Sequence, residues 1–581
     1  MLKGDFINNL GKVYGIYTGG FIGFVIVLAI LEQMGVPNQI IGYLFVFLTI
    51  GIYALIGVLS RTAQISEYYV AGRRVPAIYN GMATGSDWMS GASFVGMAGT
   101  LYLLGYDGLA FVLGWTGGYV LVAVLLAPYL RKFGAFTVPD FLAVRYGGNL
   151  ARSVGIIVLI SCSFTYVTAQ IYATGIITSR FLGLSFEVAV FAGLVGILLC
   201  SMLGGMRAVT WTQVAQYIIL IIAYLTPVVI LSAQITGVPI PQLMYGGILE
   251  KIAVIEGQMG IAKAHAQPFT TYDPLNYFAL IFCLMLGTAS LPHILMRYFT
   301  TPSVREARIS VGWSLLFIFL LYFTAPSYAA FAKYEVLTNV IGQPIAALPA
   351  WVQAWGNIGL VTIKDANLDG ILQWSELNIN TDVIVLATPE IAGLPYVVAG
   401  LVAAGGLAAA LSTADGLLLA IANALSHDIY YKMVDPKADS KRRLIVARVL
   451  LVIVAVAAAW LASTKPSDIL SMVAWAFSIA ASGLFAPLVL GVWWKRATSV
   501  GAICGMIAGF GVCMYYLIGT QYGGMQPWFG VRNISAGLFG IPAAFVVTWV
   551  VSLLTPAPSK DMQDFVDSIR LPRGGPIMQE N

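Results

Sequence analysis

Charge is scarce in this chain: only 10% of its 581 residues are Asp, Glu, Lys or Arg, whereas 59% are hydrophobic and the mean hydropathy is +0.85. This composition excludes a soluble globular protein. Histidine is scarcer still, and the three histidines are not paired as haem ligands would be. The five cysteines form neither a disulfide pattern nor a Cys-x-x-Cys site; they are Cys162, Cys200, Cys283, Cys504 and Cys513.

The chain contains many long apolar runs with little or no charge. Many of these runs reach about 20 residues, the length of a membrane-spanning helix. We therefore predict an all-α polytopic membrane protein with 14 spans and both termini in the cytoplasm. We divide it into two N-terminal helices with a cytoplasmic loop (1–75), a ten-helix core (76–494) and two C-terminal helices with a tail (495–581). The spans are expected at about residues 14–34, 38–60, 76–104, 108–130, 153–179, 186–205, 208–236, 275–298, 308–332, 393–429, 442–463, 468–494, 499–520 and 535–555.

The formal net charge of +5 comes from an excess of Lys and Arg on one side of this threading. The excess is typical of cytoplasmic loops and does not indicate a nucleic-acid partner. The first apolar run is long and lacks a small-x-small cleavage site, so we expect a retained helix and not a signal peptide. Seven of the 31 basic residues fall on the outer side: Arg180, Lys251, Lys263, Lys333, Lys364, Lys465 and Arg532.

The third expected span is interrupted by polar and small residues at 83–99 (ATGSDWMSGASFVGMAG). A carboxylate such as Asp87 costs about 3 kcal/mol at the centre of a membrane helix and marks an ion or substrate pathway. The eighth span is interrupted in the same way at 287–293 (GTASLPH). Interrupted helices at matching positions of two five-helix halves indicate an inverted-repeat transporter with its site at the midplane. The alternative is that Gly and Pro are simply common in membrane helices.

A third polar group lies in the eighth core helix, where Ser412 and Thr413 are adjacent and Asp415 follows. Two hydroxyls with backbone carbonyls suit a hard monovalent cation. The alternative is that both hydroxyls donate to carbonyls one turn earlier in their own helix, which is frequent and needs no ligand. That alternative leaves Asp415 unexplained.

The long outer loop at 333–392 contains a match to the calcium-loop pattern D-x-[DN]-x-[DN]-G-x5-E at residues 365–376. Side-chain oxygens, a backbone carbonyl and a bidentate carboxylate at this spacing supply a hard-cation cage. We predict a weak structural Ca²⁺ site, and the alternative is an acidic surface turn. The expected ligands are Asp365, Asn367, Asp369, Ile371, Gln373 and Glu376.

Several segments, taken in order, resemble the sodium/solute symporter family over residues from about 66 to the last helices. Three general segments are 67–73 (EYYVAGR), 204–212 (GGMRAVTWT) and 410–413 (ALST). Three more are similar to the cation/acetate symporter, or acetate permease, branch: 287–300 (GTASLPHILMRYFT), 305–308 (REAR) and 425–430 (LSHDIY). The first helix and the calcium-like loop lie outside the resemblance.

The resemblance implies a LeuT-type 5+5 inverted-repeat core that couples solute uptake to sodium by alternating access. Its sodium site would use the backbone carbonyls of Ser86, Met89 and Ala409 with the hydroxyls of Ser412 and Thr413. The chain departs from many sodium-coupled members in one respect: Gln213 stands where they have Asp. Asp415 supplies the additional carboxylate instead. A second cation or a proton is therefore expected at Asp87, Asp415 and Gln213.

We expect the solute to be a small, acetate-like monocarboxylate. Hydroxyls at the two helix breaks would bind it, namely those of Ser90, Ser93, Thr288 and Ser290. Arg297 is expected near the inner end, too far away to take part. We expect His293 to donate a hydrogen bond to the freed backbone, with titration as the alternative. Asp428 is expected in a cytoplasmic cap or ion pair.

The main hypothesis is thus a sodium-coupled monocarboxylate symporter in the cell membrane, and no part of the chain predicts an enzyme. An amino acid or another small organic solute is the alternative within this class. A channel, a solute sensor or an ion-pumping respiratory subunit is the alternative outside it. A respiratory subunit would need ligating histidines or lines of intramembrane Lys and Glu, which are absent from the sequence. The sequence does not predict an oligomeric state.

Overall fold

A computed structural model describes residues 5–571 and 576–577. In this part of the chain, twelve helices are long and apolar enough to cross a membrane, which confirms an all-α polytopic membrane protein. One of them, Ala92–Phe133, covers parts of two expected spans, and Phe186–Leu199 is a shorter apolar helix. The total of 14 crossings therefore stays a prediction.

The first half of the chain is helical almost throughout. Its α-helices are α1 (Asp5–Asn8), α2 (Leu10–Gln33), α3 (Asn38–Leu59), α4 (Ile65–Val70), α5 (Ala77–Trp88), α6 (Met97–Leu104), α7 (Leu109–Leu121), α8 (Ala127–Phe133), α9 (Val138–Tyr146), α10 (Asn149–Leu182), α11 (Phe186–Thr236), α12 (Pro241–Met259), α13 (Pro274–Thr288) and α14 (Pro292–Met296). A π-helical turn, η2 (Ala92–Gly96), precedes α6, and a 3₁₀ turn, η5 (Arg297–Thr300), follows α14.

The second half adds one small sheet, in which β1 (Val361–Ile363) pairs antiparallel with β2 (Leu377–Ile379). A π-helical segment, η8 (Ala424–Val434), extends the longest buried helix, α18. The α-helices are α15 (Val304–Asn339), α16 (Ala350–Gly356), α17 (Ile384–Ile391), α18 (Tyr396–Asn423), α19 (Ser440–Ser463), α20 (Ile469–Ala480), α21 (Ala486–Trp493), α22 (Ser499–Gln521), α23 (Gly537–Leu554) and α24 (Lys560–Arg570).

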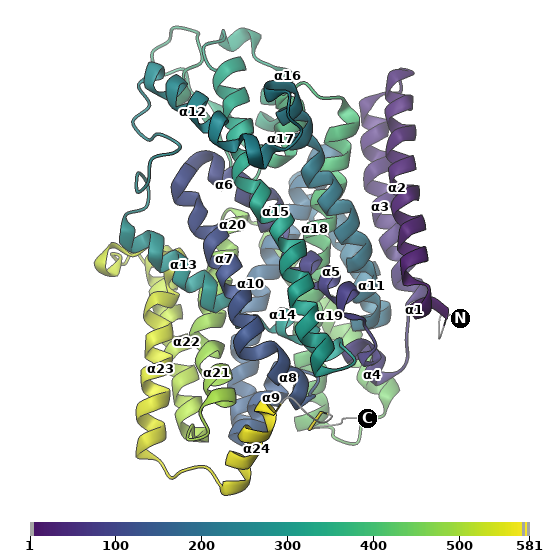
Figure 1. The fold of residues 1–581 in the computed structure, drawn as a ribbon, viewed down its shortest axis with the longest axis vertical. Helices are drawn as coiled ribbons and strands as arrows, with labels where there is room; N and C mark the ends of the chain where they lie inside the picture. Colours follow the sequence, from purple (N-terminus) through teal and green to yellow (C-terminus); the bar gives the residue numbers. More distant parts are fainter. Residues whose placement is uncertain (1–4, 572–575, 578–581) are drawn as a thin grey trace.

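The central helices are flanked by two hairpins that lie on opposite sides of the molecule. Figure 1 shows α2 and α3 on one side and α22 and α23 on the other. The most hydrophobic 18 residues of α18 are entirely buried, whereas only 17% of the corresponding window of α2 is buried. The Ala- and Gly-rich sequence of α18 explains its position, because small side chains let neighbouring helices approach closely.

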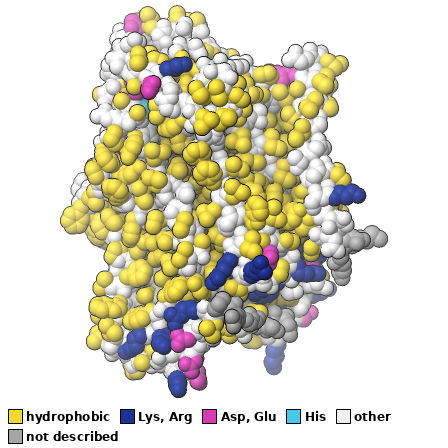
Figure 2. All heavy atoms as spheres, in the orientation of Figure 1, with side chains coloured by type: hydrophobic (Ala, Val, Ile, Leu, Met, Phe, Trp, Pro, Cys, Tyr) yellow, Lys and Arg dark blue, Asp and Glu magenta, His cyan; other side chains and the backbone are white. Residues whose placement is uncertain are grey.

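Charged side chains mark the two ends of the molecule, and a hydrophobic band separates them. In Figure 2, Lys and Arg gather toward the lower end, where Figure 1 places α24. We call this end the basic face and assign it to the cytoplasm by the positive-inside rule. The opposite end, the outer face, carries α12, α16 and α17 (Figure 1). The segment between the spans expected at 208–236 and 275–298 contains a helix, α12, which buries Ile248 and Ile252.

Candidate functional site

The break expected within 83–99 lies directly after α5. The helix ends at Trp88, and Met89 leaves helical geometry at φ −76°, ψ 68°. The amide freed by this break is satisfied from a neighbouring helix, since Gln170 Oε1 on α10 accepts a hydrogen bond from the Gly91 N–H at 2.7 Å. The first broken helix is therefore held open by a specific partner.

The second break separates α13 from α14 at residues 289–291. Its two hydroxyls bond within their own helix: Thr288 Oγ1 donates to the Leu284 carbonyl and Ser290 Oγ to the Leu286 carbonyl, both at 2.7 Å. Pro292 then starts α14, which suits proline because the first turn of a helix needs no amide donor. Both hydroxyls predicted to bind solute at this break are thus engaged by the backbone.

The hydroxyls of α18 reach the first broken helix. Ser412 Oγ donates to the Ser86 carbonyl at 2.8 Å, and Thr413 Oγ1 donates to the Asp87 carbonyl at 2.8 Å. Both also contact the Ala409 carbonyl, at 2.9 and 3.3 Å. The structure thus brings together four of the five predicted sodium ligands, with the Asp87 carbonyl beside them. The Met89 amide closes the last turn of α5 on the Gly85 carbonyl at 2.8 Å.

The Asp87 side chain forms an ion pair that the sequence did not predict. Arg297 Nε lies 3.0 Å from Asp87 Oδ2, and both side chains are fully buried. Arg297 Nη1 also donates to Thr210 Oγ1 on α11 at 3.1 Å. The expectation that Arg297 is an anchor at the inner end was therefore wrong. Because η5 directly continues α14, the second break carries Arg297 into the protein interior and not toward the cytoplasm.

Close packing keeps the Asp87 carboxylate against α18. A β-carbon added to Gly416 would lie 2.4 Å from Asp87 Oδ1, so only glycine fits there. Asp415 is the preceding residue, and its Oδ1 accepts a hydrogen bond from Ser201 of α11 at 2.8 Å. Gln213, also on α11, donates to the Ser412 carbonyl at 2.7 Å. Asp87 and Gln213 thus contact α18 close to Asp415, and all three residues were predicted from sequence.

Aromatic side chains pack around the residues that follow the first break, and we call this group, with Ser90 and Ser93, the aromatic cluster. Ser93 Oγ lies 2.8 Å from the Tyr322 hydroxyl, and Tyr166 lies close to Ser90. The ring of Trp88 packs edge-on against those of Trp115, Tyr119 and Phe477. The hydroxyl-bearing residues of the aromatic cluster are at most 2% exposed, so the cluster is buried.

Several buried polar atoms in this region have no hydrogen-bond partner in the described part of the chain. They include the indole N–H groups of Trp88 and Trp115 and both ring nitrogens of His293. The expected hydrogen bond from His293 to the freed backbone is therefore not made, and the ring packs against Tyr166 instead. Buried donors without partners are costly, and a solute with acceptor oxygens would satisfy them.

Sequence reasoning missed two residues of this region, Gln170 and Tyr322, and misplaced a third, Arg297. Gln170 was detectable as an isolated amide within the apolar helix α10, where a buried polar group needs a partner. Arg297 was detectable because it follows His293 by four residues and shares its helix face. The reach of Tyr322 across to Ser93, 229 residues away, had no sequence signal.

A second buried polar cluster lies near the basic face. His427 Nε2 lies 2.9 Å from Asp140 Oδ2, and Arg152 contacts Asp140 at 3.1 Å and Asp428 at 3.6 Å. Burial acts to raise the pKa of Asp140, but the hydrogen bond from His427 and the charge of Arg152 outweigh it and lower that pKa. The ion pair predicted for Asp428 is confirmed. Arg152 partly neutralises the two carboxylates, so the cluster forms a buried network of ion pairs.

The loop at 365–376 adopts a compact turn on the outer face. Leu368 and Gly370 have positive φ values of 61° and 75°, and Glu376 folds back to accept hydrogen bonds from the amides of Ala366 and Gln373. Asp365 Oδ1 is buried and has no hydrogen-bond partner among the described residues. Asp365, Asp369 and Glu376 each accept a hydrogen bond from a backbone amide of the same loop.

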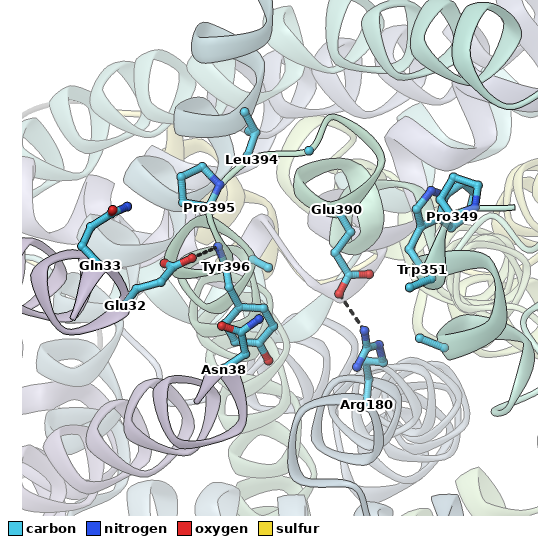
Figure 3. Close-up of a pocket in the computed structure, with 14 residues that line it drawn as sticks. Glu32, Gln33, Asn38, Arg180, Pro349, Trp351, Glu390, Leu394, Pro395 and Tyr396 are labelled. Carbon is cyan, nitrogen blue, oxygen red and sulfur yellow. Dashed lines mark hydrogen bonds and ion pairs between the residues drawn. The ribbon is translucent and has the colours of Figure 1, made fainter. Parts of the chain in front are cut away.

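A pocket of about 600 Å³ lies on the outer face, between the α2–α3 hairpin and the start of α18 (Figure 3). Its acids bind neighbouring protein groups. The Glu32 carboxylate accepts the amides of Tyr396 and Val397, and Glu390 pairs with Arg180 at 2.6 Å. These contacts hold the N-terminal hairpin and α17 against the core. The pocket therefore lies at the junction between these elements.

Two broken helices that meet a hydroxyl-bearing helix in a membrane bundle define the class of this protein as a secondary transporter, not an enzyme. The chain belongs to the sodium:solute symporter family, whose model matches residues 68–364 and 357–509. The acetate-permease branch suggested by the sequence is not part of this finding.

Relatives and a solved structure agree with the family. The chain is 45% identical to an uncharacterized symporter of Cupriavidus necator (97% of this chain, 99% of that protein) and 28% identical to one of Bacillus subtilis (87% and 92%). Its fold is similar to the outward-open structure of a Na⁺-coupled sialic acid symporter, with a TM-score of 0.68 and 17% identity over 90% of this chain and 99% of that one. The LeuT-type fold is thereby established, and the protein is a multi-pass membrane symporter.

Proposed function

We propose that this symporter couples the uptake of a small, acetate-like monocarboxylate to sodium. The observation that carries the sodium part is the convergence of the Ser412 and Thr413 hydroxyls on the carbonyls of the first broken helix, at 2.8 Å. Oxygen atoms this close and this well buried need a cation or a donated hydrogen between them. When sodium enters, each hydroxyl turns its hydrogen away and its oxygen becomes a ligand.

The proposed sodium ligands are the carbonyls of Ser86, Met89 and Ala409 and the hydroxyls of Ser412 and Thr413. The Asp87 carboxylate balances the charge of this region from the adjacent position. Arg297 holds that carboxylate at 3.0 Å through one nitrogen, which leaves Asp87 Oδ1 without a partner among the described residues. Asp87 Oδ1 is therefore available to interact with the sodium ion.

We assign the second cation to the space among Asp87, Asp415 and Gln213. Asp415 Oδ2 has no hydrogen-bond partner in the described part, and Gln213 presents an unpaired Oε1. A buried acid with a free oxygen is expensive inside a membrane unless a positive charge neutralises it.

We assign the solute site to the aromatic cluster beside the first break. Its indole N–H groups and the hydroxyls of Ser90 and Ser93 suit a carboxylate, and the surrounding rings suit a short apolar tail. Thr288 and Ser290 line the second break as proposed solute residues that act only if they release their backbone carbonyls.

The test is uptake of radiolabelled acetate, pyruvate and proline into proteoliposomes, with and without an inward sodium gradient. We expect acetate, with or without pyruvate, to accumulate only with the gradient, and proline not to accumulate. Accumulation of proline alone would replace the monocarboxylate with an amino acid, and uptake unaffected by the gradient would refute sodium coupling.

We also propose that residues 365–376 bind Ca²⁺ as a structural ion. The supporting observation is the unpaired Asp365 Oδ1, which lies in the same turn as the inward-folded Glu376. Asp369, Asn367, the Ile371 carbonyl and Gln373 complete the oxygen set that calcium prefers.

Calcium should raise the melting temperature of the purified protein, with half-saturation at about 0.1–1 mM, as in extracellular modules. Asp365→Ala should abolish this shift. Thr362→Ala, on the exposed side of β1, is the matched control and should retain it. An equal shift in the Asp365→Ala variant would refute the site.

A further inference from the structure

A buried carboxyl group on the outer face belongs to neither site described above. Asp382 lies between β2 and α17 and is fully buried. Its Oδ2 accepts a hydrogen bond from the amide of Ile469, the first residue of α20, at 3.3 Å. Its Oδ1 has no hydrogen-bond partner within residues 5–571 and 576–577. An acid in this state is far better accommodated with a proton than as an anion.

Asp382 lies where the outer cover of the transporter meets the first broken helix. The preceding residue, Thr381, packs so closely on α6 that a β-carbon on Gly99 would lie 1.8 Å from the Thr381 carbonyl oxygen. A β-carbon on Gly96, the last residue of η2, would lie 3.4 Å from Asp382 Oδ1. We call residues 380–391, which include α17, the outer lid. It rests on η2, the turn that carries Ser93.

The charged surroundings of Asp382 come from two neighbouring elements. Asp468, the N-cap residue of α20, faces Asp382, and the Tyr172 hydroxyl on α10 also faces Asp382. η2 and α6 present glycine backbone at this contact. Farther out, Asp468 faces Tyr272. The guanidinium carbon of Arg532 lies 4.8 Å from the centre of the Tyr272 ring. Burial, and then the negative charge of Asp468, raise the pKa of Asp382 to about 8.

We propose that Asp382 is a proton-binding residue of the outer gate: the lid closes with Asp382 protonated, and loss of that proton favours the open lid. The closed lid removes Asp382 from water, whereas an open lid hydrates it and restores an ordinary acid. The ligand of this site is a proton from the outer side, and the site requires no particular solute.

The direction of the effect follows from linkage. A group with a raised pKa binds more protons in the closed state, so closure is favoured at low pH and is lost as the pH rises through about 8. Between the ordinary carboxyl pKa of about 4 and the raised value of about 8, each pH unit weakens closure about tenfold; above about 8 the acid is ionised in both states and closure no longer depends on pH.

The experiment measures how fast a membrane-impermeant maleimide labels a cysteine beneath the lid. Leu470 is 2% exposed, and its Cβ is 3.7 Å from the position of a Gly96 β-carbon, so Leu470→Cys reports lid opening. Thr362→Cys, exposed on β1, reports the thiol's own pH dependence. The ratio of the two labelling rates is followed from about pH 6 to about pH 9.5, in full-length protein in right-side-out vesicles.

We expect the ratio to rise from about pH 6 and to level off above about pH 8 in the otherwise unchanged chain. Asp382→Asn should make the ratio independent of pH, and Asp468→Asn should move the rise to lower pH because it removes a neighbouring negative charge. Retained solute uptake shows that each variant is folded. A flat ratio in the unchanged chain, or the same rise with Asp382→Asn, would overturn the proposal.

Discussion

The two broken helices look alike in sequence but satisfy their polar groups in opposite ways. At the first break, Ser93 reaches Tyr322 and the freed Gly91 amide is held by Gln170. At the second, the hydroxyls of Thr288 and Ser290 return to carbonyls one turn earlier. The first break thus depends on other helices and exposes groups to a ligand. The second is self-contained, and its role is to direct the helix that carries Arg297 toward Asp87.

The largest effect is expected where the two breaks meet. Asp87→Asn should lower sodium-dependent uptake by at least about 100-fold, because it removes the carboxylate from the ion site. It also leaves Arg297 buried without its partner, which costs about 3–5 kcal/mol. Uptake in proteoliposomes and thermal unfolding measure the two losses separately.

A double variant separates stability from function. Asp87→Asn with Arg297→Met replaces the pair by uncharged groups and should recover most of the melting temperature, since replacing a buried pair is often neutral. It should not recover uptake. If sodium-dependent uptake returned with it, the Asp87 charge would have no part in coupling.

A smaller effect is expected from the hydroxyls, and it differs between the helices. Ser412→Ala or Thr413→Ala should raise the half-saturating sodium concentration about 10- to 100-fold, the loss of one contact to a charged group. Thr288→Ala should leave sodium affinity within about threefold, because its hydroxyl serves its own helix. Equal effects at the two helices would remove the distinction between the breaks.

The smallest effect is expected at the support of the first break. Gln170→Leu leaves the Gly91 amide unsatisfied, at a cost of about 1–3 kcal/mol, and should lower the melting temperature and the uptake rate together. Thr174→Val, one turn along α10, is the control, since its hydroxyl only returns to the Gln170 carbonyl. A wild-type melting temperature for Gln170→Leu would mean that the break needs no partner.

The sequence predicted the bundle and much of the site because both depend on local composition. Apolar runs define spans, and clusters such as residues 83–99 are improbable inside a lipid-facing helix. The spacing of Ser412 and Thr413 also placed two hydroxyls together on one helix. Arg297 was misplaced because it lies close along the chain to the basic segment 305–308, which suggested a position near the inner end. The break in the helix instead directs Arg297 into the protein interior.

What the sequence by itself determined is therefore the class of protein, its membrane character and the residue types that an ion site needs, all of which follow from hydrophobicity and short-range spacing. The tertiary structure alone decided which partners those residues have. The pairing of Asp87 with Arg297, the contact of Gln170 with Gly91 and the burial of Asp382 under the outer lid join segments 79 to 210 residues apart. Such contacts arise from packing between helices, and no local pattern encodes them.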